Sequence, residues 1–417
     1  MKYYSALLLS VTALIVLTLP GPVSGEPPSS SQESAKPYSL GFLPYAMFSD
    51  DKGFGIGIIV QWDDKRSPDY QPYYLSHRIM FERTTRGIGD YSYRLDSKYI
   101  LPASLRLTLE ARYIASLFEP YHGPGGAQTE YNSEYVDTRG KYYYMYDKRY
   151  LQVNTLVQGW LKGEELRWLA GLVILRTWVD TMDYTDYNKS PGETLLAHHW
   201  EGLGTDTAGG LENGLLAGIV WDRRDHETSP HKGFWSEVLL RWVPNIPGND
   251  FTYTVLTATH RQYVPLSEAL TFAFRFSGRF MTDGAPFFTM PRLDGSFKTE
   301  TGLGGNKTIR GVLWQRAVGN RFFYGNLELR YRILSLFQTG YLAGSAFYDF
   351  GRTFDEPPPA NMADRGDDQD RWHQGLGIGG RVAFHATFIG ALDIALPADK
   401  VMDGTGLKIY IGLDWLF

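Results

Sequence analysis

Apolar and polar residues alternate along most of the chain after residue 38. The pattern is clearest in 54–62, 105–113 and 270–277. In 105–113, every odd residue from Leu105 to Tyr113 is apolar, whereas every even residue from Arg106 to Arg112 is polar or charged. A period of two places alternate side chains on opposite faces of a β-strand, so these segments are predicted to be strands with one apolar and one polar face.

The alternation predicts about sixteen strands, and several exceed the five or six residues that are usual in globular sheets. They lie near residues 38–48, 54–63, 73–85, 88–100, 103–116, 147–160, 166–181, 212–222, 233–245, 251–264, 268–283, 321–333, 340–352, 371–384, 388–397 and 406–417.

The predicted connections alternate between short turns, such as 161–165, and long loops, of which 284–320 is the longest. An even number of long strands with short turns at one rim and long loops at the other is typical of an outer-membrane barrel. In such a barrel the apolar face meets lipid and the polar face meets a wet lumen. The sequence therefore predicts an all-β fold, a sixteen-stranded antiparallel transmembrane β-barrel.

The N-terminal segment predicts export. Lys2 is followed by an apolar run from Ala6 to Leu19, and small residues before Glu26 offer a cleavage site. This run is shorter than the roughly 20 residues that a transmembrane helix needs. We expect a cleaved signal peptide at 1–25, a Pro/Ser linker at 26–37 and a barrel over 38–417, located in the outer membrane of a Gram-negative cell.

Composition narrows the function further. The 417 residues include 45 Gly, 28 Tyr, 23 Phe and 11 Trp, a combination that suits β architecture. The absence of Cys excludes disulfides, thiol nucleophiles and Cys-ligated metals. The 41 Lys and Arg against 46 Asp and Glu provide no basic excess for nucleic acid, so we expect no nucleic-acid partner.

The candidate motifs for chemistry are weak. Residues 375–380 (GLGIGG) match a dinucleotide-binding pattern, but no helix follows them, and glycines lining one face of a strand explain them better. His198 and His199 are adjacent, so their side chains diverge. We expect no cofactor, no metal and no enzymatic activity. The acidic segment 355–370 suggests a solvated loop or cation bridging to lipopolysaccharide, and outer-membrane lipids and lipopolysaccharide are the expected surroundings.

Five elements in the C-terminal half carry more information. A charged turn over 222–233 contains Asp222, Arg223, Asp225, Pro230 and Gly233; loop segment 304–311 contains Arg310 and Gly311; the next two strands contain Glu328 and Asp349; and the last strand ends with Trp415 and Phe417. Alternation predicts that Glu328 and Arg330 face the lumen. The strand around Asp349 is apolar on both faces, so its direction stays open.

Together these elements resemble the barrel of the bacterial surface antigen superfamily, the BamA/TamA-like outer-membrane proteins, most strongly over 212–417. The resemblance implies that the sixth extracellular loop folds into the lumen, where Arg310 and Gly311 meet Glu328 and Asp349. It also implies that the 222–233 turn is periplasmic and that Trp415 and Phe417 form the C-terminal barrel signal. The chain departs from the family at Val312, where a bulky aromatic residue is usual.

The linker 26–37 is too short for a polypeptide-transport-associated domain, so we expect a barrel-only member. The resemblance implies a role in inserting or translocating envelope proteins or lipids, with a periplasmic partner or client protein. The mechanism it suggests is opening of the seam between the first and last strands. A passive pore for small solutes, constricted by 284–320, is the alternative, and a barrel-embedded hydrolase is a further one without a convincing catalytic group.

Overall fold

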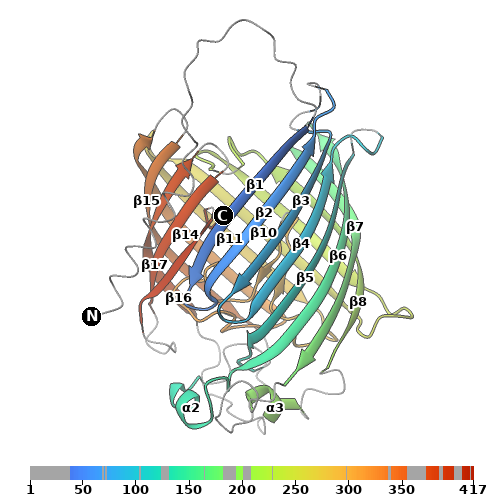
Figure 1. Cartoon of the computed structure of the whole chain (residues 1–417), viewed down its shortest axis with the longest axis vertical. Helices are drawn as coiled ribbons and strands as arrows, with labels where there is room; N and C mark the ends of the chain where they lie inside the picture. The colour runs from blue at the N-terminus through green and yellow to red at the C-terminus, as the bar shows by residue number, and fades with distance from the viewer. Residues whose placement is uncertain are drawn as a thin grey trace, which may run out of the picture.

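Sixteen strands form a closed antiparallel barrel in the computed structural model (Figure 1), which confirms the predicted fold class. The structure describes residues 38–417 apart from 68–69, 71–72, 103–104, 124–130, 164, 182–193, 201–207, 228, 297, 337–339, 355–371, 385–387, 399–405 and 414. The predicted signal peptide, the linker and the acidic loop 355–370 lie outside the described residues.

The barrel strands run in chain order, and each pairs with the next one along the chain. They are β1 (Tyr38–Ser49), β2 (Gly53–Asp64), β3 (Leu75–Thr84), β4 (Ile88–Ser97), β5 (Arg106–Pro120), β6 (Met145–Lys162), β7 (Leu166–Asp180), β8 (Gly209–Asp222), β9 (Gly233–Val243), β10 (Tyr253–Pro265), β11 (Leu270–Met281), β14 (Arg321–Leu336), β15 (Gly340–Thr353), β16 (His373–Phe384), β17 (Phe388–Pro397) and β18 (Lys408–Leu413).

Two short helices, α2 (Ser133–Thr138) and α3 (Leu195–His199), lie in the connections after β5 and β7. Within the described ranges, neither helix has the length and apolar content needed to cross a bilayer. Both helices lie at the end of the barrel that is lowermost in Figure 1.

The connections fall on two rims. The loop rim carries the long connections 121–144, 181–208 and 282–320, and the turn rim carries short connections such as 163–165 and 266–269. Tight hairpins at 50–52 and 85–87 also lie at the loop rim, so the predicted alternation in length holds less well over the first four strands. We call 282–320 loop 6.

Strand faces are inverted relative to a soluble protein. On β9, the outward residues Val238, Leu240 and Trp242 are exposed, whereas the intervening Glu237 and Arg241 are buried in the interior. The same alternation of exposed apolar and buried residues runs along β8 and β10. Charged side chains therefore line the lumen and apolar side chains cover the outside, as the sequence predicts.

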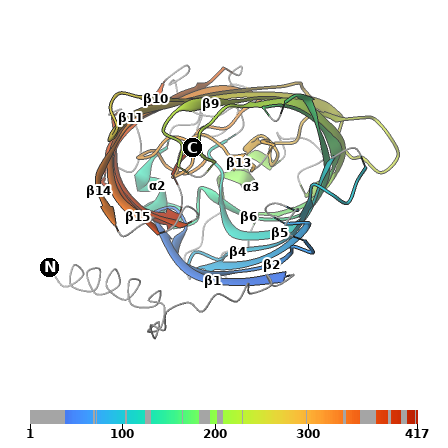
Figure 2. The same ribbon diagram turned by 90° about the horizontal axis from the view of Figure 1, so that it is seen from above.

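Loop 6 lies inside the ring of strands, which Figure 2 shows by the position of β13. It contains a two-residue hairpin, β12 (Arg292–Leu293) paired with β13 (Glu300–Thr301), which the sequence analysis did not predict. An apolar cluster that includes Leu303, Ile309 and Val312 packs the loop against Phe322 and Tyr324 of β14. Part of the barrel interior is thus filled by the loop's own core.

The end of the chain differs from the prediction. The sequence predicts a strand over 406–417, but β18 ends at Leu413, and Trp415 and Phe417 lie buried in the interior instead of facing outward. Figure 2 places the C-terminus inside the ring of strands. The physical reason is a cluster of cations. The Arg330 guanidinium lies 4.4 Å from the Trp415 ring and 4.7 Å from the Phe417 ring, and arginine attracts aromatic faces.

The ring closes through a short seam. Among the described residues, β1 pairs with β18 at two positions, Phe48 with Ile411 and Ser49 with Tyr410, whereas it pairs with β2 along all twelve of its residues. β17 pairs with β18 at six positions. The last strand therefore holds its predecessor more firmly than it holds the first strand.

Candidate functional site

Loop 6 reaches the barrel wall through a backbone that turns sharply at glycines. Gly304, Gly305 and Gly311 have φ values of +110°, +81° and +92°, in the region that favours glycine. A Cβ atom on Gly304 would lie 1.8 Å from the Leu313 carbonyl oxygen. These glycines let 304–311 fold tightly enough to direct the Arg310 side chain at the wall.

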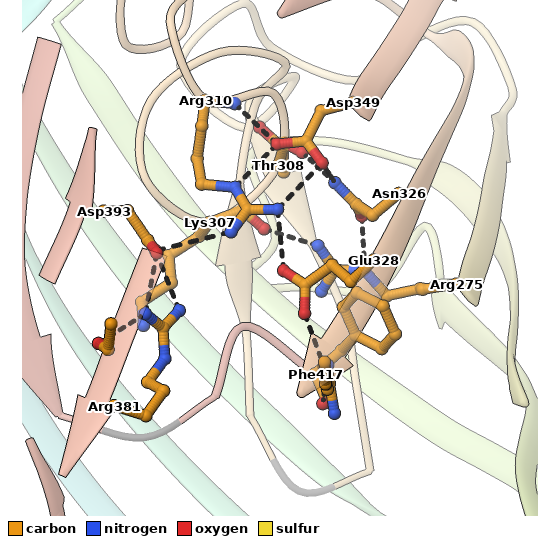
Figure 3. A network of polar contacts seen from close by, with 12 residues as sticks. Arg275, Lys307, Thr308, Arg310, Asn326, Glu328, Asp349, Arg381, Asp393 and Phe417 are labelled. Carbon is orange, nitrogen blue, oxygen red and sulfur yellow. Dashed lines mark hydrogen bonds and ion pairs between the residues drawn. The ribbon is translucent and has the colours of Figure 1, made fainter. Parts of the chain in front are cut away.

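Arg310 is fully buried and contacts three acidic residues on three strands (Figure 3). Its Nε donates to Asp349 Oδ2 at 2.7 Å, its Nη2 lies 2.7 Å from Glu328 Oε1, and its Nη1 lies 3.3 Å from Asp393 Oδ2. The Arg310 backbone N–H also donates to Asp349 at 3.0 Å. The guanidinium lies 3.4 Å from the centre of the Phe347 ring. The loop is thereby fixed to β14, β15 and β17.

The acids around Arg310 bind further arginines. Glu328 accepts a hydrogen bond from Arg330 Nε at 2.8 Å, and Asp393 is held by both terminal nitrogens of Arg381 at 2.7 and 2.9 Å. We call Arg310, Arg330, Arg381, Glu328, Asp349 and Asp393 the lumen network. It contains three guanidinium groups and three carboxylates, so its formal charges balance. Because each carboxylate is bound by arginine, the arrangement is suited to anchoring the loop.

The structure brings together Arg310, Glu328 and Asp349, the residues that the family resemblance selects. It places Asp349 inward, which settles the direction that its strand pattern left open. Asp393 and Arg381 were not selected. The available signal was a lone charge, Asp393, in the apolar predicted strand 388–397, and an arginine, Arg381, in the glycine-rich, largely apolar part of the predicted strand 371–384.

A glycine face on β16 makes room for the loop. A Cβ atom on Gly375 would lie 1.8 Å from the Arg310 carbonyl oxygen, and one on Gly379 would lie 2.2 Å from an Asp393 carboxylate oxygen. Gly380, which faces the other way, has nothing within 4 Å of its Cβ position. The GLGIGG segment is thus a glycine-lined strand face, and its glycines admit the main chain of loop 6.

A second cluster fixes the loop closer to the loop rim. Asp294 accepts from Arg241 Nε of β9 at 2.8 Å and from Arg292 Nε at 2.6 Å, and Arg292 Nη1 donates to Gln152 Oε1 of β6 at 2.6 Å. Burial acts to raise the pKa of Asp294, but the Arg241 and Arg292 guanidinium groups outweigh it and lower the pKa to about 2. The loop therefore has anchors on opposite parts of the wall.

The predicted turn motif lies between β8 and β9, at the turn rim. Asp222 accepts two hydrogen bonds from the Arg224 side chain, at 2.8 Å each, and Asp225 accepts from the His231 backbone N–H at 3.0 Å. Gly233 has a φ of +102°, and a Cβ there would lie 2.0 Å from the Arg223 carbonyl oxygen. Arg223 itself forms an exposed ion pair with Glu165 at 3.2 Å. Pro230 is buried and lines a small cavity.

The C-terminal residues are joined to the lumen network. Arg330 Nη2 donates to the main-chain oxygen of Phe417 at 3.0 Å, and Trp415 Nε1 donates to the Tyr341 hydroxyl at 3.2 Å. Arg330 therefore bridges Glu328, the partner of loop 6, and the segment that follows β18.

The adjacent histidines of α3 diverge. His199 is buried with its Nδ1 3.1 Å from the Tyr121 hydroxyl, whereas His198 is exposed. In the part of the chain that the structure describes, no group of three or more His, Asp or Glu side chains is placed to hold a metal ion.

Comparisons with known proteins agree with this architecture. The barrel is similar to a crystal structure of BamA from Haemophilus ducreyi lacking POTRA domains 1-3, with a TM-score of 0.59 and 13% identity over 91% of this chain and 70% of that one. It is also similar to CdiB from Acinetobacter baumannii (TM-score 0.53, 10% identity, 91% and 60%) and CdiB from Escherichia coli (0.52, 10%, 91% and 68%). Identities this low show the fold alone.

This chain thus spans about three fifths of the Acinetobacter protein. A search of curated proteins found no match. The profile of the Omp85 superfamily domain, however, matches residues 89–414, which is most of the barrel. The chain therefore belongs to the Omp85 superfamily.

Proposed function

We propose that the chain is a Gram-negative outer-membrane barrel that assists insertion or translocation of envelope proteins or lipids by opening the seam between β1 and β18. The fold-level likeness to BamA and CdiB supports this class of role. In this orientation the loop rim is extracellular and the turn rim periplasmic.

The outer surface supports a position in a bilayer. Aromatic side chains form a girdle near each rim, as is typical of transmembrane barrels. The exposed members include Trp62, Trp160 and Trp221 near the turn rim and Trp178, Trp242 and Phe280 near the loop rim. Exposed aliphatic residues such as Ile56, Ile174 and Leu256 cover the belt between the girdles.

The seam is the observation on which the mechanism depends. Two paired positions between β1 and β18, against twelve between β1 and β2, make this junction the weakest among the barrel's strand pairs. A free strand edge presents unpaired N–H and C=O groups, which is a template for an incoming strand. Opening the barrel at the seam therefore breaks fewer strand-to-strand hydrogen bonds than opening it between other strands.

Loop 6 touches both sides of the seam from within. The Gly311 backbone N–H donates to the Tyr410 hydroxyl of β18 at 3.2 Å, and the Trp314 backbone N–H donates to Asp51, just beyond β1, at 3.3 Å. The Lys52 ammonium lies 4.7 Å from the Trp314 ring. Seam opening is thereby linked to movement of the loop, and the lumen network resists both.

A cross-link tests the proposal cleanly because the chain has no native Cys. Phe48→Cys with Ile411→Cys joins the seam, and Phe42→Cys with Val60→Cys joins β1 to β2, where no opening is required. In a depletion strain, we expect the oxidised seam pair to fail in restoring the other envelope components, reductant to rescue it, and the control pair to work throughout. Full activity of a cross-linked seam would overturn the mechanism, and depletion without any effect on the envelope would overturn the role.

The lumen wall of β3 favours one second candidate, a passive pore. Arg78 faces the interior and is exposed, with its guanidinium bonded to Gln61 Oε1 at 2.7 and 3.0 Å. This side of the lumen is reached by water. If the chain conducts solutes past loop 6, Arg310→Ala should raise the conductance of planar bilayers; unchanged conductance would remove the loop as the constriction.

A further inference from the structure

A small cavity at the turn rim borders the lumen network, with which it shares Arg330. The β8–β9 turn folds across the rim and covers it, opposite the ends of β11, β14 and β15. Its polar lining consists mainly of Ser229, His231, Thr271, Arg330, Arg332 and Tyr341. The turn is fixed over the cavity because Ser229 and Tyr341 share a hydrogen bond of 2.6 Å and His231 Nδ1 bonds the Thr271 hydroxyl.

Two guanidinium groups at this cavity have unused donors. Arg330 is 5% exposed; its Nε and Nη2 bind Glu328 and Phe417, but its Nη1 has no hydrogen-bond acceptor among the described residues. Arg332 is exposed, and its guanidinium stacks 4.9 Å from the Tyr341 ring without an ion-pair partner in the described ranges. A buried unsatisfied donor is costly, so an acceptor supplied from outside would be bound favourably.

The hydroxyl groups extend this donor set. The Ser229 and Tyr341 hydroxyls share one hydrogen bond, and Tyr341 also accepts from Trp415 Nε1, so the pair has one hydroxyl hydrogen left to donate to a ligand oxygen. Together with two guanidinium groups they offer donors from several directions. That arrangement suits a tetrahedral oxyanion better than a planar carboxylate, which one arginine fork satisfies.

We propose that this cavity binds a phosphate group, carried by a phospholipid headgroup or free in solution, through Arg330, Arg332 and the Ser229 and Tyr341 hydroxyls. The site shares Arg330 with the lumen network, but its test measures phosphate binding and does not depend on seam opening. Because Arg330 also binds Phe417 and Trp415 lines the cavity, an occupied site would contact the same residues that hold the end of the chain.

Glu268 provides a substitution whose expected effect on phosphate binding is opposite to that of the arginine variants. It is the one acidic residue of the lining and is exposed, so its charge opposes an anion. Arg332→Gln should weaken phosphate binding about tenfold, since a charged hydrogen bond and a nearby positive charge are lost, whereas Glu268→Gln should tighten it a few-fold. Tyr341→Phe keeps the ring under Arg332, removes the hydroxyl and should weaken binding by a smaller factor.

The measurement is calorimetric titration of the full chain, folded in an uncharged detergent, with inorganic phosphate and with short-chain phosphatidic acid. Arg78→Gln is the matched control, because Arg78 is also exposed and lies across the barrel on β3. Gel mobility before and after heating verifies that each variant is folded.

Equal affinity for both probes would identify free phosphate as sufficient, and binding of phosphatidic acid alone would identify the lipid. Either result supports the site if Arg332→Gln weakens it and Arg78→Gln does not. Binding of neither probe, or equal losses in the two arginine variants, would overturn the proposal.

Discussion

The two sides of the lumen use the same chemistry and differ in what it holds together. On the β3–β5 side, arginine–carboxylate pairs join adjacent strands. Arg106, 23% exposed, binds the buried Asp96 at 2.7 Å, and Arg94 lies 3.8 Å from Glu110, with side chains 20% and 24% exposed. On the β14–β17 side, Arg310 joins a loop to the wall and is 0% exposed. On the β3–β5 side, therefore, the ion pairs lie in a wall that water reaches, which we call the wet wall. On the β14–β17 side, Arg310 and its three acids form a buried contact between loop 6 and the wall, which we call the dry joint.

Removing the central cation should produce the largest effect. Arg310→Ala leaves Asp349 without an arginine partner, while Glu328 keeps Arg330 and Asp393 keeps Arg381, so one buried carboxylate charge is uncompensated; breaking a buried ion pair typically costs about 3–5 kcal/mol. We expect a strong drop in the temperature at which the folded band is lost in gel-shift assays. Arg310→Lys should recover only part of it, because a lysine lacks the fork that contacts three acids. If Arg310→Ala lost its folded band at the wild-type temperature, the dry joint would not stabilise the barrel.

Adding a side-chain atom at the glycine that contacts loop 6 should produce the next largest loss of stability. Gly375→Ala places a Cβ 1.8 Å from the Arg310 carbonyl oxygen, so the loop main chain must move, at a cost of about 1–3 kcal/mol. Gly380→Ala on the same strand meets nothing within 4 Å and should leave stability unchanged. Comparing the thermal midpoints of the two variants isolates the contact with the loop, and equal midpoints would refute it.

Acid should loosen the loop at its second anchor. The Asp294 pKa falls from 3.8 to about 2 on folding, so its contribution is complete above about pH 4 and is lost as the pH falls toward 2. The shift corresponds to on the order of 2 kcal/mol. We expect Asp294→Asn to be less stable than wild type at neutral pH, and the gap to narrow below pH 4. A gap that is constant from pH 7 to pH 2.5 would rule out this linkage.

Substitutions in the wet wall should have the smallest effect on stability. Arg94→Ala removes a pair that water already screens, and we expect a loss of about 0.2–1 kcal/mol that shrinks further in high salt. Unfolding at low and at high ionic strength measures this. A loss as large as that of Arg310→Ala would erase the distinction between the two walls.

The sequence was sufficient to predict the features that a local pattern encodes. Period-two alternation predicted the strands, and the family motifs selected Arg310, Glu328 and Asp349. The sequence did not predict contacts between side chains that come together only through the register of neighbouring strands around the barrel. Asp393 and Arg381 become partners of Arg310 only because β16 and β17 bring them level with the loop, and no local pattern encodes that alignment. The inward turn at Trp415 was missed for a related reason: alternation continues to Phe417, whereas the arginines that attract these rings lie far away in sequence.

The seam also affects the surrounding lipid. Among the described residues, the stretch of β1 from Tyr38 to Met47 pairs with β2 alone, which leaves its other edge without a strand partner. Hydrocarbon offers peptide groups no hydrogen bonds, and each unsatisfied group there costs several kcal/mol. Water or lipid polar groups must therefore reach this edge, so we expect the bilayer to be thinner and more hydrated beside β1 than elsewhere around the barrel.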